Sequence, residues 1–198
     1  MIDCTGHGVP GAFLSILAND FLKQSLTVKN VNTPDEILNF LNESVSSHFN
    51  QQGSKRRIRD GMDIALIGID YLNYRLYYAG ANNPIYIFRQ AENDCVEEII
   101  VKATKQAIGS EAEQTVPYKL EEIDLQKGDM IYLFSDGFAD QFGGPKNKKL
   151  TYKAFRTILA EAYPLEVSQQ KEYIEAKLEE WKDGTEQTDD VCVLGIRI

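Results

Sequence analysis

The chain has 198 residues, of which 43% are hydrophobic and 26% are charged, a balance typical of a globular protein with a sizeable core. Its net charge of −9 argues against a nucleic-acid partner, because such partners usually meet a basic surface. Its three cysteines are far apart and no run of about 18 apolar residues occurs, so a disulfide scaffold and a membrane span are excluded and a cytoplasmic protein is predicted.

The N-terminal stretch, residues 2–13, combines an acid, a glycine-rich turn and the start of a helix. Asp3 lies where a short apolar strand would end, and Pro10 suits the first turn of a helix. Three glycines allow a tight turn and a close approach of the backbone to a ligand: Gly6, Gly8 and Gly11. The helix that follows carries an apolar stripe expected on its buried face: Phe13, Ile16, Leu17 and Phe21.

The glycines of this turn match the pattern G-x-G-x-x-G, but a dinucleotide-binding fold also needs a strand that ends in an acid about 20 residues later. Residues 30–34 are typical of a loop instead, and no Gly-Lys-Ser or Gly-Lys-Thr follows, so the sequence disfavours a nucleotide site. A tight turn before a core helix would account for the glycines, although it leaves the acid before them unexplained.

A second helix is predicted to begin at Thr33 and Pro34, with Glu36 able to close a capping box. Its expected buried stripe consists of Ile37, Leu38, Leu41, Val45 and Phe49. Residues 54–61 then hold four cations within five positions. This basic segment is either a solvated loop or a docking patch for an acidic or phosphorylated partner.

The middle of the chain reads as strands that follow one another without helices, so they should be antiparallel. These strands are expected at residues 62–70, 75–79, 85–88, 96–101 and 118–125. Residues 129–137 form another strand that ends at an acid and a glycine. Two helices, one capped by Thr151 and one ended by Gly184, precede a last strand over 191–198. This order predicts an α+β domain in which helices flank an antiparallel β-sandwich.

Acids stand at the ends of three apolar strands: Asp3, Asp136, and Asp189 or Asp190. One such acid is usually a cap or a turn residue, but three raise the prospect of a shared site. Carboxylates that converge away from water repel one another unless a cation neutralises them. A site built from oxygen ligands alone suits Mg²⁺ or Mn²⁺.

Four segments, in chain order, resemble the bacterial metal-dependent phosphatases of type 2C in the stage II sporulation protein E class. Residues 3–12 resemble the motif D-x-x-G-H-G-x-P-A/G-A, and residues 78–84 resemble Y-x-x-A-G-H-N-P-P, with Ala81 and Asn83 in place of the usual His and Pro. Residues 133–137 match L-x-S-D-G, and residues 188–193 match D-D-x-T/x-V. The resemblance covers the whole chain.

The resemblance implies two antiparallel sheets flanked by helices and a pair of Mn²⁺ or Mg²⁺ ions that activate a bridging water. Asp3 would bridge both ions, Cys4 would contribute its backbone carbonyl, and Asp136 and Asp189 would complete the first site. Further residues implied near the phosphate or behind the ligands are Gly6, His7, Gly137 and Asp190. No catalytic role is carried over to His7, and Asp63, where many members have Thr or Ser, is left unassigned.

The substrate implied by the resemblance is phosphoserine or phosphothreonine on a regulatory protein, typically an anti-sigma-factor antagonist. The alternative is a catalytically weak regulatory or partner-binding module that keeps the phosphatase fold.

Members of this class have a further strand pair before the opening motif, which supplies a carboxylate to the second metal, and the chain begins two residues before Asp3. We therefore expect residues 1–198 to be the C-terminal part of a phosphatase domain, with one metal rather than two and low activity. An open sheet edge would favour a homodimer. The parent would carry an upstream sensor domain, and a missing N-terminal region could anchor it to a membrane.

Overall fold

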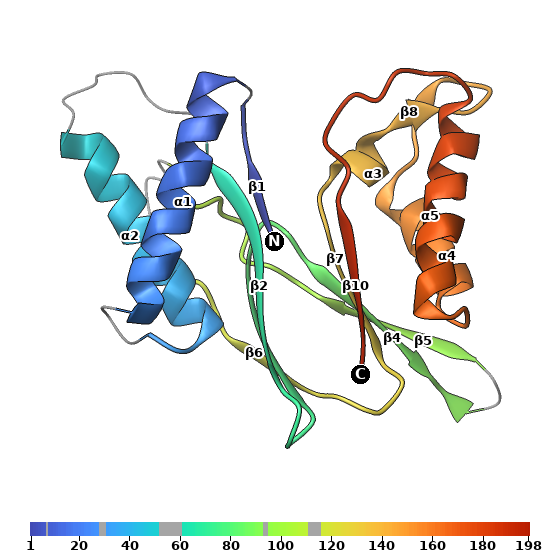
Figure 1. Cartoon of the computed structure of the whole chain (residues 1–198), viewed down its shortest axis with the longest axis horizontal. Coiled ribbons are helices and arrows are strands. Elements are labelled where there is room, and N and C mark those ends of the chain that lie inside the picture. Colours follow the sequence, from blue (N-terminus) through green and yellow to red (C-terminus); the bar gives the residue numbers. More distant parts are fainter. Residues whose placement is uncertain (7, 28–30, 52–60, 93–94, 111–115) are drawn as a thin grey trace. The chain divides into compact units, whose positions relative to one another are not determined.

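The computed structural model describes residues 1–6, 8–27, 31–51, 61–92, 95–110 and 116–198. The chain forms two compact units (Figure 1). Unit 1 comprises Met1–Pro84 and Val101–Leu125, and unit 2 comprises Ile85–Ile100 and Gln126–Ile198. The four cations of the basic segment lie outside the described residues, so neither interpretation of that segment is tested.

Unit 1 is built on a four-stranded sheet in the order β1-β2-β3-β6, and its paired strands are antiparallel as expected. The strands are β1 Ile2–Cys4, β2 Met62–Asp70, β3 Arg75–Ala81 and β6 Glu121–Asp124. The inner position of β2 explains why its sequence is apolar on both faces. β2 and β3 form the predicted hairpin, whose turn is fixed by the Asp70 carboxylate, which accepts the backbone N–H groups of Leu72 and Asn73.

Two helices, α1 Val9–Thr27 and α2 Pro34–Gln51, pack against each other and against this sheet (Figure 1). The stripe predicted for α2 is confirmed where its side chains are described, because Ile37, Leu38, Leu41 and Val45 are all buried.

The stripe predicted for α1 is wrong in its first two turns. Phe13 and Ile16 are 43% and 66% exposed, whereas Leu14 and Ala18 enter the core at 3% and 1%. The helix carries apolar residues around most of its circumference, so periodicity alone permits more than one buried face. The buried face instead carries Leu14 together with the small residues Gly11 and Ala18.

Unit 2 is built on a second four-stranded sheet in the order β10-β7-β4-β5. Its strands are β4 Ile85–Gln90, β5 Val96–Val101, β7 Met130–Phe134 and β10 Val193–Arg197. The two helices that the sequence predicted are α4 Tyr152–Ala162 and α5 Val167–Lys182, and they pack against each other. A one-turn helix, α3 Gly137–Asp140, and a small hairpin, β8 Phe142–Gly143 with β9 Lys148–Lys149, are too short to leave a periodic signal.

The core of unit 2 is rich in aromatic rings. Phe155 of α4 lies edge-on to Phe134 of β7, with ring centroids 5.2 Å apart, and stacks on Phe138 of α3 at 4.5 Å. Thr151 stands at the N-cap of α4 as predicted, but its side chain makes no capping hydrogen bond. The rings hold α3 and α4 to the end of β7, which is where the second acid motif begins.

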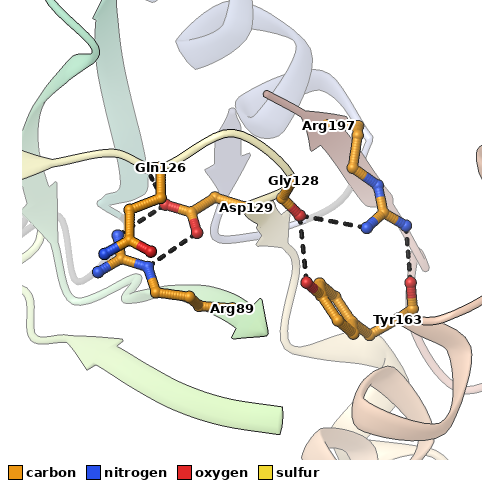
Figure 2. A network of polar contacts seen from close by, with 6 residues as sticks. All are labelled: Arg89, Gln126, Gly128, Asp129, Tyr163 and Arg197. Atoms are coloured by element: carbon orange, nitrogen blue, oxygen red, sulfur yellow. Dashed lines mark hydrogen bonds and ion pairs between the residues drawn. The ribbon is translucent and has the colours of Figure 1, made fainter. Parts of the chain in front are cut away.

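A partly buried polar network anchors the other end of β7, and Figure 2 shows its members: Arg89, Gln126, Gly128, Asp129, Tyr163 and Arg197. The Asp129 side chain is fully buried and receives two hydrogen bonds from the Arg89 guanidinium, at 2.8 and 2.7 Å. Arg197 of β10 donates to the carbonyl oxygens of Gly128 and Tyr163. Charge-assisted bonds of this kind fix the turn before β7 and thereby the register of β7 with β10.

The expected α+β class, with antiparallel sheets and flanking helices, is confirmed. All three cysteines are free. Within the described residues, no helix combines the length and the apolar character needed to cross a bilayer.

Candidate functional site

Asp3 lies on β1 directly across from Asp63 of β2. Ile2 and Cys4, its neighbours along the strand, pack toward the helical core, so Asp3 and Asp63 share the opposite face of the sheet. Residues paired in this way have Cβ atoms about 4.5–5.5 Å apart. Burial raises the pKa of Asp63, and a 2.8 Å hydrogen bond from the Asn82 amide to Oδ1 partly offsets that effect.

The glycine turn after β1 is tied to the start of β2. Thr5 donates its backbone N–H and its hydroxyl to the Gly61 carbonyl, at 2.9 and 2.8 Å, and its hydroxyl oxygen accepts the Gly61 N–H. Gly6 has a φ of +90°, and a Cβ added to Gly11 would lie 2.8 Å from the Gly6 carbonyl oxygen. The need for glycine is thus confirmed at both positions, while His7 lies outside the described residues.

Asp136 follows β7 and occupies the N-cap position of α3, whereas Asp189 and Asp190 lead into β10. Because β7 and β10 are antiparallel partners, the end of one strand meets the start of the other. A Cβ added to Gly137 would collide with the Asp190 carbonyl oxygen and would lie 3.3 Å from the Asp189 Cβ. The structure therefore brings the two acid motifs of unit 2 together, and it requires glycine at position 137.

Ser135 joins these two motifs by hydrogen bonds. Its hydroxyl donates to the Asp190 carbonyl at 2.8 Å and accepts the Cys192 N–H at 2.9 Å. Its own N–H donates to the Cys192 carbonyl at 3.0 Å. Ser135 is only 4% exposed, so its side of these bonds is shielded from water.

The donors that this structure offers fit a hard divalent cation. Asp136 and Asp189 lie on adjoining segments, and carboxylate oxygens are the ligands that Mg²⁺ and Mn²⁺ prefer. The Cys4 side chain packs against the helical core and its sulfur accepts a 3.5 Å hydrogen bond from Ser15, so the thiol belongs to the face away from Asp3. This placement agrees with a role for the Cys4 carbonyl alone.

The complete ligand set stays a prediction. Asp3 belongs to unit 1, and Asp136 and Asp189 belong to unit 2. Over the parts of the chain that the structure describes, no group of three or more His, Cys, Asp or Glu side chains is close enough to hold a metal.

Sequence reasoning assigned no role to two polar residues that the structure places beside the predicted ligands. Asn82 orients Asp63, and only the strand register reveals that Asp63 faces Asp3. Gln141 is fully buried and bonds to the segment before Asp189. A lone glutamine after a short helix has no sequence signal that would have singled it out.

Comparison with known proteins identifies the family. The family model for stage II sporulation protein E (SpoIIE) matches residues 1–198. The chain belongs to the SpoIIE family. No curated protein matches it.

The fold of this SpoIIE-family chain also resembles solved structures of phosphatase domains. It superposes on the SiaA-PP2C domain of Pseudomonas aeruginosa with a TM-score of 0.83 and 27% identity, covering 100% of this chain and 74% of that one. For the PP2C phosphatase domain and regulatory-domain fragment of SpoIIE from Bacillus subtilis, the TM-score is 0.69 at 18% identity, with 99% of this chain and 51% of that chain covered. The catalytic domain of the phosphatase PstP, solved with two manganese ions, gives 0.58 at 17% identity, covering 98% of this chain and 84% of that one.

The chain is thus a SpoIIE-family domain with the fold of PP2C phosphatases. The expected family and its fold are confirmed. The chain spans about half of the Bacillus subtilis structure that it matches.

Proposed function

We propose that this domain hydrolyses phosphoserine or phosphothreonine on a regulatory protein, such as an anti-sigma-factor antagonist, and that it requires Mn²⁺ or Mg²⁺. The observation that carries the proposal is the meeting of Asp136 and Asp189 at adjoining ends of β7 and β10, in a chain of the SpoIIE family. The manganese ions in the PstP structure support the metal requirement.

In this proposal, Asp3, Asp136 and Asp189 hold the metal through carboxylate oxygens, and Cys4 contributes its carbonyl. A bound divalent ion lowers the pKa of its water and stabilises charge on the attacking and leaving oxygens. The chain itself positions these groups. Ser135 bonds to the backbone of Asp190, the residue after Asp189, and Gly137 lets the segments that carry Asp136 and Asp189 approach each other.

The glycine turn is proposed to face the phosphate, because glycines let backbone N–H groups approach an anion closely. Gly6 and His7 belong to this turn. In the proposal, Gly137 and Asp190 support the neighbouring ligands Asp136 and Asp189. We also propose that a regulatory region acts on the phosphatase domain, since the Bacillus subtilis structure contains a fragment of such a domain.

The test compares Asp136→Asn with Asp140→Asn. Asp140 lies on the same short helix, but its carboxylate makes an exposed 2.7 Å ion pair with Lys149, which is worth about 0–1 kcal/mol. Mn²⁺ affinity is measured by titration calorimetry, and phosphate release is measured from a phosphoserine peptide.

We expect Asp136→Asn to abolish both signals, because an amide removes the charge of a hard-ion ligand, and Asp140→Asn to leave both near wild type. Undiminished Mn²⁺ binding by Asp136→Asn would refute the metal assignment. Binding without hydrolysis by the wild-type chain would support the regulatory module instead.

A further inference from the structure

Gln141 is a buried glutamine directly after α3, and its side chain reaches the segment that carries Asp189. It is 0% exposed. Its amide nitrogen donates to the carbonyl oxygens of Phe142 at 2.9 Å and Glu186 at 3.0 Å, and its amide oxygen accepts the Thr188 N–H at 3.4 Å. Both functional groups of the amide are therefore engaged.

Within the segment 186–190, the Gln187 amide donates to the Asp189 carbonyl at 2.8 Å, and Asp189 Oδ1 accepts the Asp190 N–H at 2.7 Å. These bonds shape the segment locally but do not tie it to the rest of unit 2. The segment contains no helix or strand, and all five of its residues are exposed. Exposed backbone outside secondary structure opens at low free-energy cost unless specific bonds hold it. Gln141 holds this segment on one side of Asp189, and Ser135 holds Asp190 on the other.

The bonds of the Gln141 side chain are separate from those that dock α5 nearby. Trp181 of α5 donates its indole N–H to the Gln141 backbone carbonyl at 3.0 Å, and its own carbonyl accepts the Gly144 N–H at 2.8 Å. These contacts use the backbone at position 141, so a side-chain substitution leaves them in place. The side chain is thus directed at its own neighbour Phe142 and at the Asp189 segment.

We propose that Gln141 is a positioning residue, which sets the Asp189 carboxylate relative to Asp136. Asp136 and Gln141 stand at the two ends of the single turn of α3, so a bond from Gln141 to the Asp189 segment ties one acid to the other. The match is specific, because the Glu186 carbonyl accepts a hydrogen bond here and the Thr188 N–H donates one. Glutamine supplies both from one group. This inference rests on the proposed metal-binding function of Asp136 and Asp189.

The test replaces Gln141 with Met, which keeps the length of the side chain and removes its hydrogen bonds. The matched control is Gln170→Met. Gln170 is also buried, at 3% exposure, and also uses its whole amide: it donates to the Leu165 carbonyl at 3.1 Å and accepts the Tyr132 hydroxyl at 2.8 Å. None of these partners lies in either acid segment.

Four quantities are measured on the full chain: stability in urea, Mn²⁺ affinity by titration calorimetry, amide hydrogen exchange of residues 186–192 without metal, and turnover of a phosphoserine peptide. Both variants should lose comparable stability. Only Gln141→Met should weaken Mn²⁺ binding, by about tenfold or more, as when other residues that orient metal ligands are removed. In Gln141→Met, the rate of amide hydrogen exchange at Thr188 should rise. Saturating Mn²⁺ should restore turnover in this variant, because the proposed metal ligands are unchanged.

Equal Mn²⁺ affinities for Gln141→Met and wild type would overturn the proposal, as would an equal loss in Gln170→Met. If Gln141→Met fails to fold, Gln141→Asn replaces it, since it keeps the neutral amide but shortens the side chain by one methylene and so weakens both bonds. A smaller loss of Mn²⁺ affinity is then expected, and an unchanged affinity would overturn the proposal. A wild-type chain that binds no Mn²⁺ refutes the proposed function, and the exchange at Thr188 then decides by itself whether Gln141 orders the segment.

Discussion

The two acid-bearing regions of this protein are held in different ways. Asp3 lies on β1, a three-residue strand at the edge of its sheet, which is held by the backbone ladder with β2 and by the hydrogen bonds of the exposed Thr5 to Gly61. Asp136 and Asp189 lie beside two strands paired over five residues, and buried side chains bond to the backbone around them.

The difference lies in how deeply the anchoring side chains are buried. Around Asp3, the exposed Thr5 bonds to Gly61 across 56 positions of the chain. In unit 2, Ser135 bonds to Asp190 across 55 positions, but Ser135 and Gln141 are only 4% and 0% exposed. Loss of a buried hydrogen-bonding group costs more than loss of an exposed one, so we expect unit 2 to be the more sensitive to changes in the side chains that anchor its acid segments.

Gly137→Ala should have the largest effect. The added methyl group would collide with the Asp190 carbonyl and push the Asp189 segment away, with an expected loss of about 1–3 kcal/mol. Mn²⁺ affinity should fall by about tenfold or more.

The control is Gly184→Ala, which also lies in unit 2 and whose added methyl group would meet nothing within 4 Å. Gly184 has a φ of +81°, so this control should lose about 1 kcal/mol of stability but keep its Mn²⁺ affinity. Equal Mn²⁺ affinities for both variants would show that the two acid segments do not depend on their close contact.

Thr5→Val tests the corresponding anchor in unit 1. The change removes both side-chain bonds to Gly61 and should cost about 1–2 kcal/mol in urea denaturation. Thr5→Ser keeps the hydroxyl and should remain near wild type. A Thr5→Ser variant as unstable as Thr5→Val would mean that the methyl group, rather than the hydroxyl, stabilises the turn.

Asp63→Asn should have a smaller effect and should raise the stability of the protein rather than lower it. Like charges directly across a strand pair are destabilising, and the amide of the variant would still offer an oxygen to the Asn82 side chain. In EDTA, we expect a gain of about 0.2–1 kcal/mol in the free energy of unfolding. A loss of similar size would show that Asp63 makes a favourable interaction with its neighbours in the metal-free protein.

Cys4→Ser should change least. The proposed ligand is the backbone carbonyl, and a hydroxyl can still accept the bond that Ser15 now donates to the sulfur. Mn²⁺ affinity is expected to stay within about twofold, since losses of about tenfold follow only when a group that orients a ligand is removed. A large drop in calorimetric affinity would implicate the thiol itself.

The local pattern of the sequence predicted most of the helices and strands, and the four motifs could be recognised in it directly. Alternation and apolar runs placed β2 and the hairpin with β3, and capping residues placed the start of α2. Residues 118–125 were expected as one strand, but only Glu121–Asp124 form β6. The sequence by itself also identified the family, because its motifs are short contiguous strings that require no knowledge of contacts.

Only the tertiary structure decided the features that depend on partners. The buried face of α1 was misjudged because several faces of that helix are apolar and close packing selects one. The pairing of Asp3 with Asp63 required the strand register, which a one-residue shift would change. The anchoring of the Asp189 segment by Gln141 joins residues 45 and 47 positions apart, and no local pattern encodes hydrogen bonds over such a separation.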